Sequence, residues 1–75
     1  SIENENFNNF KQDFGKRVKH LRFLKDLSQL DLAVQCNYEK TTISRIENGR
    51  ANVTLRTIQK LSKGLEVSAS EFFIK

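Results

Sequence analysis

Four polar side chains share one face of a short predicted helix, and their chemistry is typical of groups that contact base edges. They lie opposite Ile43 and Ile46, and they are Lys40, Thr41, Ser44 and Arg45. At about 100° per residue, the polar and apolar sets fall on opposing faces of the helix. An arginine can donate two hydrogen bonds to guanine O6 and N7, and a threonine methyl can contact thymine. We therefore predict base contacts in a DNA major groove from these four residues.

A second group of polar residues surrounds this helix and is typical of phosphate contacts. Gln29 stands at the predicted start of the preceding helix, and helix N-termini attract phosphate. Three more residues follow at the end of the base-reading helix, namely Asn48, Arg50 and Asn52. Phosphate contacts set affinity and register, whereas base contacts set sequence preference. For any single residue a solvated helix or loop is the alternative, but the combination favours DNA reading.

The distribution of charge is compatible with a polyanionic partner. The 75 residues include 13 Lys and Arg and 9 Asp and Glu, which gives a net charge of +4. Glu3 and Glu5 lie in the first ten residues, which hold no base, so the other 65 residues carry a net charge of +6. A basic body favours double-stranded DNA as a partner. The length allows one small domain.

The residue inventory argues against several other classes of function. Cys36 is the only cysteine, so it cannot form an internal disulfide or a Cys-based zinc site, and a reducing, cytoplasmic setting is expected. His20 is the only histidine and has basic neighbours, so we predict no enzyme activity, metal or cofactor. No small-molecule ligand is expected. No run approaches 18 apolar residues and no signal peptide is visible, so no membrane association is expected.

The spacing of apolar residues predicts an all-α chain. Helices are expected over residues 10–25, 29–36, 40–48, 55–63 and 69–74. Residues 1–9 are polar and Asn-rich and are expected to form a tail, which leaves residues 10–75 as a helix-turn-helix DNA-binding domain. Ser28 with Asp31 is typical of a capping box, and Asn37 is typical of a tight turn. The predicted fold is a compact five-helix bundle.

Two helices are expected to supply much of the core. Their inward positions are predicted to be Phe10, Phe14, Val18, Leu21, Leu24, Leu55, Ile58 and Leu61. Gly64 is expected to end the fourth helix, because glycine is common just past a helix C-terminus.

The C-terminal residues predict a contact between two copies of the chain. Phe72, Phe73 and Ile74 are consecutive on one short helix and cannot all face the same core. With Phe72 inside, the residues left for a two-fold contact are Leu65, Val67, Phe73 and Ile74. A homodimer of this kind would hold two reading helices one DNA turn apart, about 34 Å. The alternative is a terminal helix that folds inward or frays.

The chain resembles a known family, the phage repressor/Cro-type helix-turn-helix proteins, also called the Xre family. The resemblance covers residues 14–73 and is carried by SQLDLA at 28–33, TISRIENG at 42–49 and TLRTIQKLSKGLEVSASEFF at 54–73. It implies a lambda-repressor-like five-helix bundle and a transcription regulator, often a repressor, that binds a palindromic operator as a homodimer. The segment Asn52–Leu55 and the small size are also similar to controller proteins of restriction–modification systems, which regulate their own operon. Prophage repressors and antitoxins are the alternatives that fit the same features.

The resemblance also implies roles for particular residues. Gln29 would contact phosphate, and Arg22 would form a partly buried salt bridge with Glu47; two exposed charges are the alternative. Asp26 and Asn37 stand where the family has glycine, and both residue types tolerate left-handed backbone. Glu39, at the front of the reading helix, is a third departure from the family pattern. It could cap the helix, accept from a cytosine amino group, or reject some operators by repulsion.

One other class of function stays open at this level. A helix-turn-helix bundle can serve as an adaptor that binds another protein. Such a module would not need small hydroxyls between cations on the Lys40–Arg45 face, and its binding would depend weakly on salt.

Overall fold

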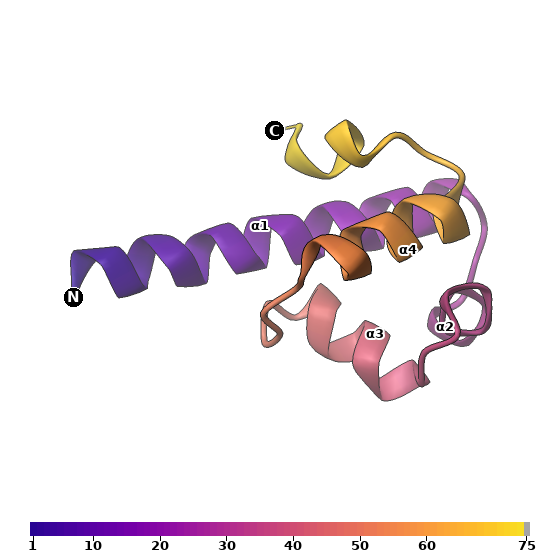
Figure 1. The fold of residues 1–75 in the computed structure, drawn as a ribbon, viewed down its shortest axis with the longest axis horizontal. Coiled ribbons are helices and arrows are strands. Elements are labelled where there is room, and N and C mark those ends of the chain that lie inside the picture. Colours follow the sequence, from indigo (N-terminus) through magenta and orange to yellow (C-terminus); the bar gives the residue numbers. More distant parts are fainter. Residues whose placement is uncertain (75) are drawn as a thin grey trace.

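The computed structural model of the chain describes residues 1–74, which form four α-helices and a short 3₁₀ helix. In chain order these are α1 (Ile2–Leu24), α2 (Gln29–Cys36), α3 (Lys40–Glu47), α4 (Leu55–Leu65) and the 3₁₀ helix η1 (Ala69–Phe73). The molecule measures 36 × 23 × 20 Å, and α1 lies along its long axis (Figure 1). The predicted all-α fold is confirmed, although its fifth helix is a 3₁₀ turn. No helix within residues 1–74 is long and apolar enough to cross a membrane.

One core holds these elements together. Its buried side chains come from all five of them: Phe14, Val18, Leu21, Leu32, Ala33, Cys36, Ile43, Ile46, Leu61, Leu65 and Phe72. Three of the predicted inward residues are instead exposed, namely Phe10, Leu24 and Leu55. Leu55 is 86% exposed because it is the first residue of α4, directly after the cap at Thr54. Periodicity places a residue on a face, but a helix end can project past its neighbours.

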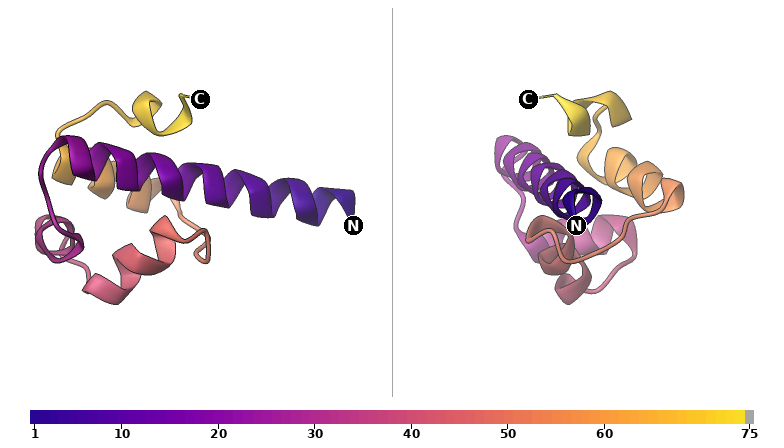
Figure 2. Two further views of the ribbon diagram at one scale, coloured as in Figure 1. Left: turned by 180° about the vertical axis from the view of Figure 1, so that it is seen from behind. Right: turned by 90° about the vertical axis from the view of Figure 1, so that its left-hand side faces the viewer.

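The first helix begins eight residues earlier than predicted. Residues 2–9, expected to form a tail, are helical and continue α1 without a break (Figure 2). Ser1 accepts a hydrogen bond from the Asn4 backbone N–H, and Glu3 and Glu5 lie in the first turn, where carboxylates stabilise the helix dipole. These turns contribute nothing to the core, since residues 1–10 are all exposed. The division of the chain at residue 9 is therefore not visible as a change of secondary structure.

The turns around α2 follow the sequence prediction. Ser28 and Asp31 form the capping box, with both hydrogen bonds at 2.9 Å. The hydrogen bonds from Ser28 hold the pKa of the Asp31 carboxyl below its usual range. Asp26 and Asn37 both have left-handed backbone, with φ of 57° and 58°. Both substitutes for glycine therefore adopt the conformation that glycine would supply.

The C-terminal end of α4 differs from the prediction. Gly64 lies inside the helix, which ends at Leu65 with Glu66 in the left-handed conformation at φ 56°. A Cβ atom at Gly64 would lie 2.9 Å from Cys36 Sγ, so the glycine permits α4 to pack closely against α2. Leu65 is only 1% exposed and belongs to the core. It cannot contribute to a dimer interface as predicted.

Candidate nucleic-acid interface

Helix α3 presents the two faces that its sequence predicted. Ile43 and Ile46 are buried against α1 and α2. On the opposite side, Lys40, Thr41 and Arg45 are exposed and Ser44 is half-buried. The apolar face anchors the helix, and the polar face is directed toward solvent.

The acidic side chain of Glu39, at the N-terminal end of α3, does not cap the helix. Glu39 precedes the helix in an extended conformation, and its side chain makes no capping hydrogen bond. Of the three interpretations of this residue, capping is therefore the one that the structure does not support. Its exposed carboxylate lies directly before Lys40 at the front of the polar face.

A glycine sets the distance between α3 and the longest helix. A Cβ atom at Gly15 would overlap the carbonyl oxygen of Ile46 and would lie 2.6 Å from that of Glu47. The end of α3 consequently packs against the backbone of α1. Sequence reasoning missed this role, although a glycine beside Phe14 on an apolar stripe was an available signal.

A buried ion pair connects the same end of α3 to α1. Arg22 Nε donates to Glu47 Oε2 at 2.7 Å, and a second guanidinium nitrogen donates to Oε1 at 2.9 Å. Both residues are 6% exposed, and the hydrogen bonds to the carboxylate raise the pKa of Arg22 above its usual value. Arg22 also donates to the Leu27 carbonyl at 2.9 Å. The predicted ion pair is present, and it joins α1, α3 and the connection that leads to α2.

Gln29 extends this network from the first turn of α2. Its side-chain nitrogen donates to Glu47 Oε1 at 3.1 Å. One amide proton of this predicted phosphate contact is thus engaged within the protein. Glu47 receives hydrogen bonds from two helices, so it fixes the angle between the two members of the helix-turn-helix.

The other predicted phosphate contacts surround the C-terminal end of α3. Asn48, Arg50 and Asn52 are all exposed. Asn48 Nδ2 donates to Ser44 Oγ at 3.4 Å, and the Arg50 backbone N–H donates to the Arg45 carbonyl at 2.9 Å. The structure therefore brings Asn48 and Arg50 next to the polar face of α3, whereas Asn52 lies near Phe10 of α1.

Tyr38 is a second positioning residue that sequence reasoning left as a simple turn residue. Its hydroxyl donates to Thr57 Oγ1 at 3.2 Å, and Lys60 Nζ lies 4.7 Å from the centre of its ring. The turn between α2 and α3 is therefore tied to α4. Within residues 1–74 no group of His, Cys, Asp or Glu side chains could hold a metal ion.

Comparisons with known proteins agree with this geometry. The helix-turn-helix family model matches residues 18–72, which include every residue of the network and of the α3 face. The chain belongs to the helix-turn-helix family. It is 45% identical over 67 residues to the control protein C.MunI of Mycoplasma sp., with 88% of this chain and 90% of the relative covered. It is 42% identical over 65 residues to the control protein C.BamHI of Bacillus amyloliquefaciens, covering 85% and 80%.

Solved structures of this helix-turn-helix family show the same similarity. The restriction–modification controller protein C.AhdI of Aeromonas hydrophila superimposes with a TM-score of 0.80 at 35% identity, covering 83% of this chain and 94% of the other. The wild-type controller protein C.Esp1396I gives a TM-score of 0.78 at 36% identity, covering 85% and 83%. The chain is thus a helix-turn-helix DNA-binding regulator homologous to restriction–modification controller proteins.

Proposed function

We propose that this regulator binds a palindromic operator as a homodimer and places α3 of each copy in the major groove. The observation that carries the proposal is the exposed polar face of α3, held to the rest of the bundle by the buried Arg22–Glu47 pair. A reading helix must be held rigidly, because base-edge hydrogen bonds require side chains at defined positions.

The four predicted base contacts have distinct roles in this proposal. Arg45 donates to a guanine, and Lys40 does so at the front of the helix. Thr41 presents its methyl or hydroxyl to a base edge, and Ser44 keeps the helix close to the groove floor. Around them the phosphate contacts are Gln29, Asn48, Arg50 and Asn52.

The relatives named as restriction–modification controller proteins support a particular biological role. We propose that this chain regulates the operon of such a system, its own gene included. No ligand is required for this activity, so the concentration of the protein itself controls operator occupancy.

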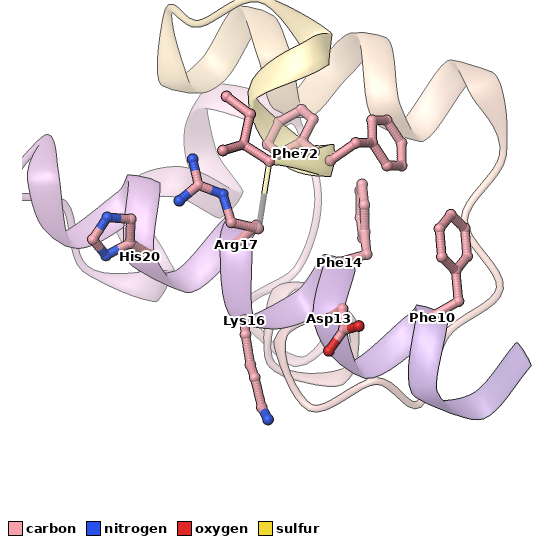
Figure 3. Close-up of a pocket in the computed structure, with 9 residues that line it drawn as sticks. Phe10, Asp13, Phe14, Lys16, Arg17, His20 and Phe72 are labelled. Atoms are coloured by element: carbon pink, nitrogen blue, oxygen red, sulfur yellow. The ribbon is translucent and has the colours of Figure 1, made fainter. Parts of the chain in front are cut away.

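The proposed dimer forms through the C-terminal end of the chain. Phe73 and Ile74 are 48% and 47% exposed, and Val67 is half-buried at the edge of the core. Phe73 and Ile74 also lie beside an open groove of about 530 Å³ between α1 and η1, much of which is visible in Figure 3. Exposed apolar side chains beside a groove are typical of surfaces that bind another protein.

A selection from randomised duplexes tests the proposal. The protein is titrated against a random duplex pool at two salt concentrations, and the bound fraction is sequenced. We expect a palindromic site with half-sites about one turn apart, and an affinity that falls steeply with salt. Absence of an enriched sequence would contradict the proposal and favour a protein-binding adaptor.

A further inference from the structure

The short 3₁₀ helix η1 positions the apolar side chains of the proposed dimer contact. Phe72 is buried in the core, whereas Phe73 and the following residue, Ile74, are about half exposed. The five residues of η1 would not form a stable helix alone, and 3₁₀ hydrogen bonds have poorer geometry than those of an α-helix. The orientation of Phe73 and Ile74 therefore depends on the contacts that fasten η1 to the rest of the chain.

Aromatic contacts fasten η1 to α1 along one part of the groove. The ring centre of Phe14 lies 5.3 Å from that of Phe72 and 5.7 Å from that of Phe73. Phe10 stacks on Phe73 with 6.0 Å between the ring centres. Apolar burial is non-directional, so these contacts constrain the rotation of η1 less strictly than a hydrogen bond does.

A directional contact joins the same two helices farther along the groove. Arg17 Nε donates to the backbone carbonyl of Glu71 at 2.9 Å, and a second guanidinium nitrogen lies 3.9 Å from a Glu71 carboxylate oxygen. Arg17 and Phe10 lie on opposite sides of Phe14 along α1 (Figure 3). Of the side-chain hydrogen bonds within residues 1–74, this one alone connects α1 with η1.

The carbonyl is the stronger of the two partners of Arg17. A hydrogen bond from a guanidinium is charge-assisted, and here it reaches a backbone group that moves with η1 itself. The carboxylate contact is long, and the Glu71 side chain is 41% exposed, so water and salt screen the charges. Glu71 lies in the last turn of η1, and carbonyl groups at the end of a helix need partners outside it. Arg17 supplies such a partner.

We propose that Arg17 is a positioning residue for operator binding, because its bond to η1 holds Phe73 and Ile74 in the orientation that dimerisation requires. The proposal rests on the homodimer of the proposed function and names the residue that prepares its surface. Each copy must present η1 correctly before two copies can associate. Loss of the Arg17 bond should therefore weaken the dimer while the core, which includes Phe72, stays formed.

The place of Arg17 on α1 separates this role from DNA reading. Gly15 packs against the end of α3, and Arg17 follows two residues later, so the two lie about 160° apart around α1. Arg17 therefore faces away from α3 and takes no part in the Arg22–Glu47 pair. Its substitution should leave the affinity of one α3 for one half-site unchanged.

Lys16 is the matched comparison for Arg17. It is the preceding residue, lines the same groove, has the same charge and is exposed. Within residues 1–74, the salt bridge from this groove to η1 comes from Arg17 and not from Lys16. If a positive charge in the groove were sufficient, the two bases would contribute equally.

Three variants test the proposal by sedimentation equilibrium, which gives the dimer dissociation constant without DNA. A threefold fall in the fraction of correctly oriented η1 raises that constant about ninefold, since both copies must be competent. We therefore expect Arg17→Met to raise it about tenfold. Lys16→Met should leave it unchanged. Glu71→Gln should change it less than about twofold, because the backbone carbonyl stays in place.

DNA binding adds a measurement that general loss of structure would not reproduce. The probes are the palindromic duplex recovered by the selection and the same duplex with one half-site scrambled. Arg17→Met should weaken binding to the palindrome and bind the single half-site as the wild type does. Equal losses on the two duplexes, with a lower melting temperature by circular dichroism, would show general destabilisation and contradict the positioning role.

The other outcomes also decide between explanations. A wild-type dimer dissociation constant in Arg17→Met would overturn this inference and leave the homodimer intact. An equal effect of Lys16→Met would show that only charge in the groove matters, and an equal effect of Glu71→Gln would show that the carboxylate is the partner that counts. Either result would overturn the role of the carbonyl bond. If the wild-type protein is monomeric on the palindrome, the homodimer fails, and this inference fails with it.

Discussion

The side chain of Glu47 links three segments around the helix-turn-helix. It accepts hydrogen bonds from Arg22 and Gln29, and so joins the last turn of α1, the first turn of α2 and the end of α3. Replacing a buried pair by apolar residues is often harmless, but removing one partner leaves the other charge buried and unpaired. The pair therefore has more value for positioning α3 than for net stability.

Glu47→Gln should lower the free energy of unfolding by about 3 kcal/mol, because it leaves the Arg22 charge buried without its counter-ion. Urea denaturation followed by circular dichroism measures the change. Glu66→Gln, which alters an exposed carboxylate, should change stability by less than about 0.5 kcal/mol. Equal effects of the two substitutions would show that the loss of the buried carboxylate costs no more stability than the loss of an exposed one.

Arg45 is also considered as a single residue, but its substitution should change DNA binding and leave the stability of the protein unchanged. Arg45→Ala should weaken operator binding by about 1–3 kcal/mol and relax the preference at one base position. Competition with operators that carry single base-pair changes measures this loss. Arg50→Ala is the matched comparison and should weaken operator and random DNA alike. If Arg45→Ala also weakened every sequence equally, Arg45 would be a phosphate contact.

At the scale of the elements, two glycines set how closely helices approach. Gly15 places α1 against the carbonyl oxygens at the end of α3, and Gly64 places α4 against Cys36 of α2. The obstacle at Gly15 is backbone, whereas that at Gly64 is the tip of side chains. A packed core responds differently to these two obstacles, because backbone cannot move without displacing a whole helix.

Gly15→Ala should therefore destabilise the protein by about 3 kcal/mol, and Gly64→Ala by about 1 kcal/mol, within the range for overpacked cores. Thermal unfolding of the two variants gives the comparison. Gly15→Ala should also weaken operator binding in the fraction that stays folded, because α3 is displaced. A milder effect at position 15 than at position 64 would contradict the close contact between α1 and α3.

At the scale of the whole molecule, we expect the open groove between α1 and η1 to connect dimerisation with DNA affinity. The proposed two-fold contact, which would bury Phe73 and Ile74, would make operator binding depend on protein concentration. Two half-sites bound by one dimer also gain affinity over a single site, since the second contact becomes intramolecular.

Changing Phe73 and Ile74 together to serine should weaken dimerisation and operator binding in parallel, each by at least about tenfold, through loss of the apolar interface. Analytical ultracentrifugation and operator titration measure the two effects. Val34→Ser removes an apolar group of α2 that is 70% exposed, and it should alter neither. A dimeric double variant with normal affinity would place the interface elsewhere.

The amino-acid sequence by itself determined the all-α class, the capping box of α2, the left-handed turns at Asp26 and Asn37, and the two faces of α3. These features depend on residues within a few positions of one another, so local propensity and periodicity are sufficient to predict them. The Arg22–Glu47 pair was reached through family resemblance, because 25 residues separate its members.

Only the tertiary structure decided which helix ends project and which are covered. It placed Leu65 in the core and Leu55 in solvent, kept Gly64 within α4, and continued α1 through residues 2–9. Each outcome depends on which neighbour packs against a position, and that neighbour is distant in the sequence.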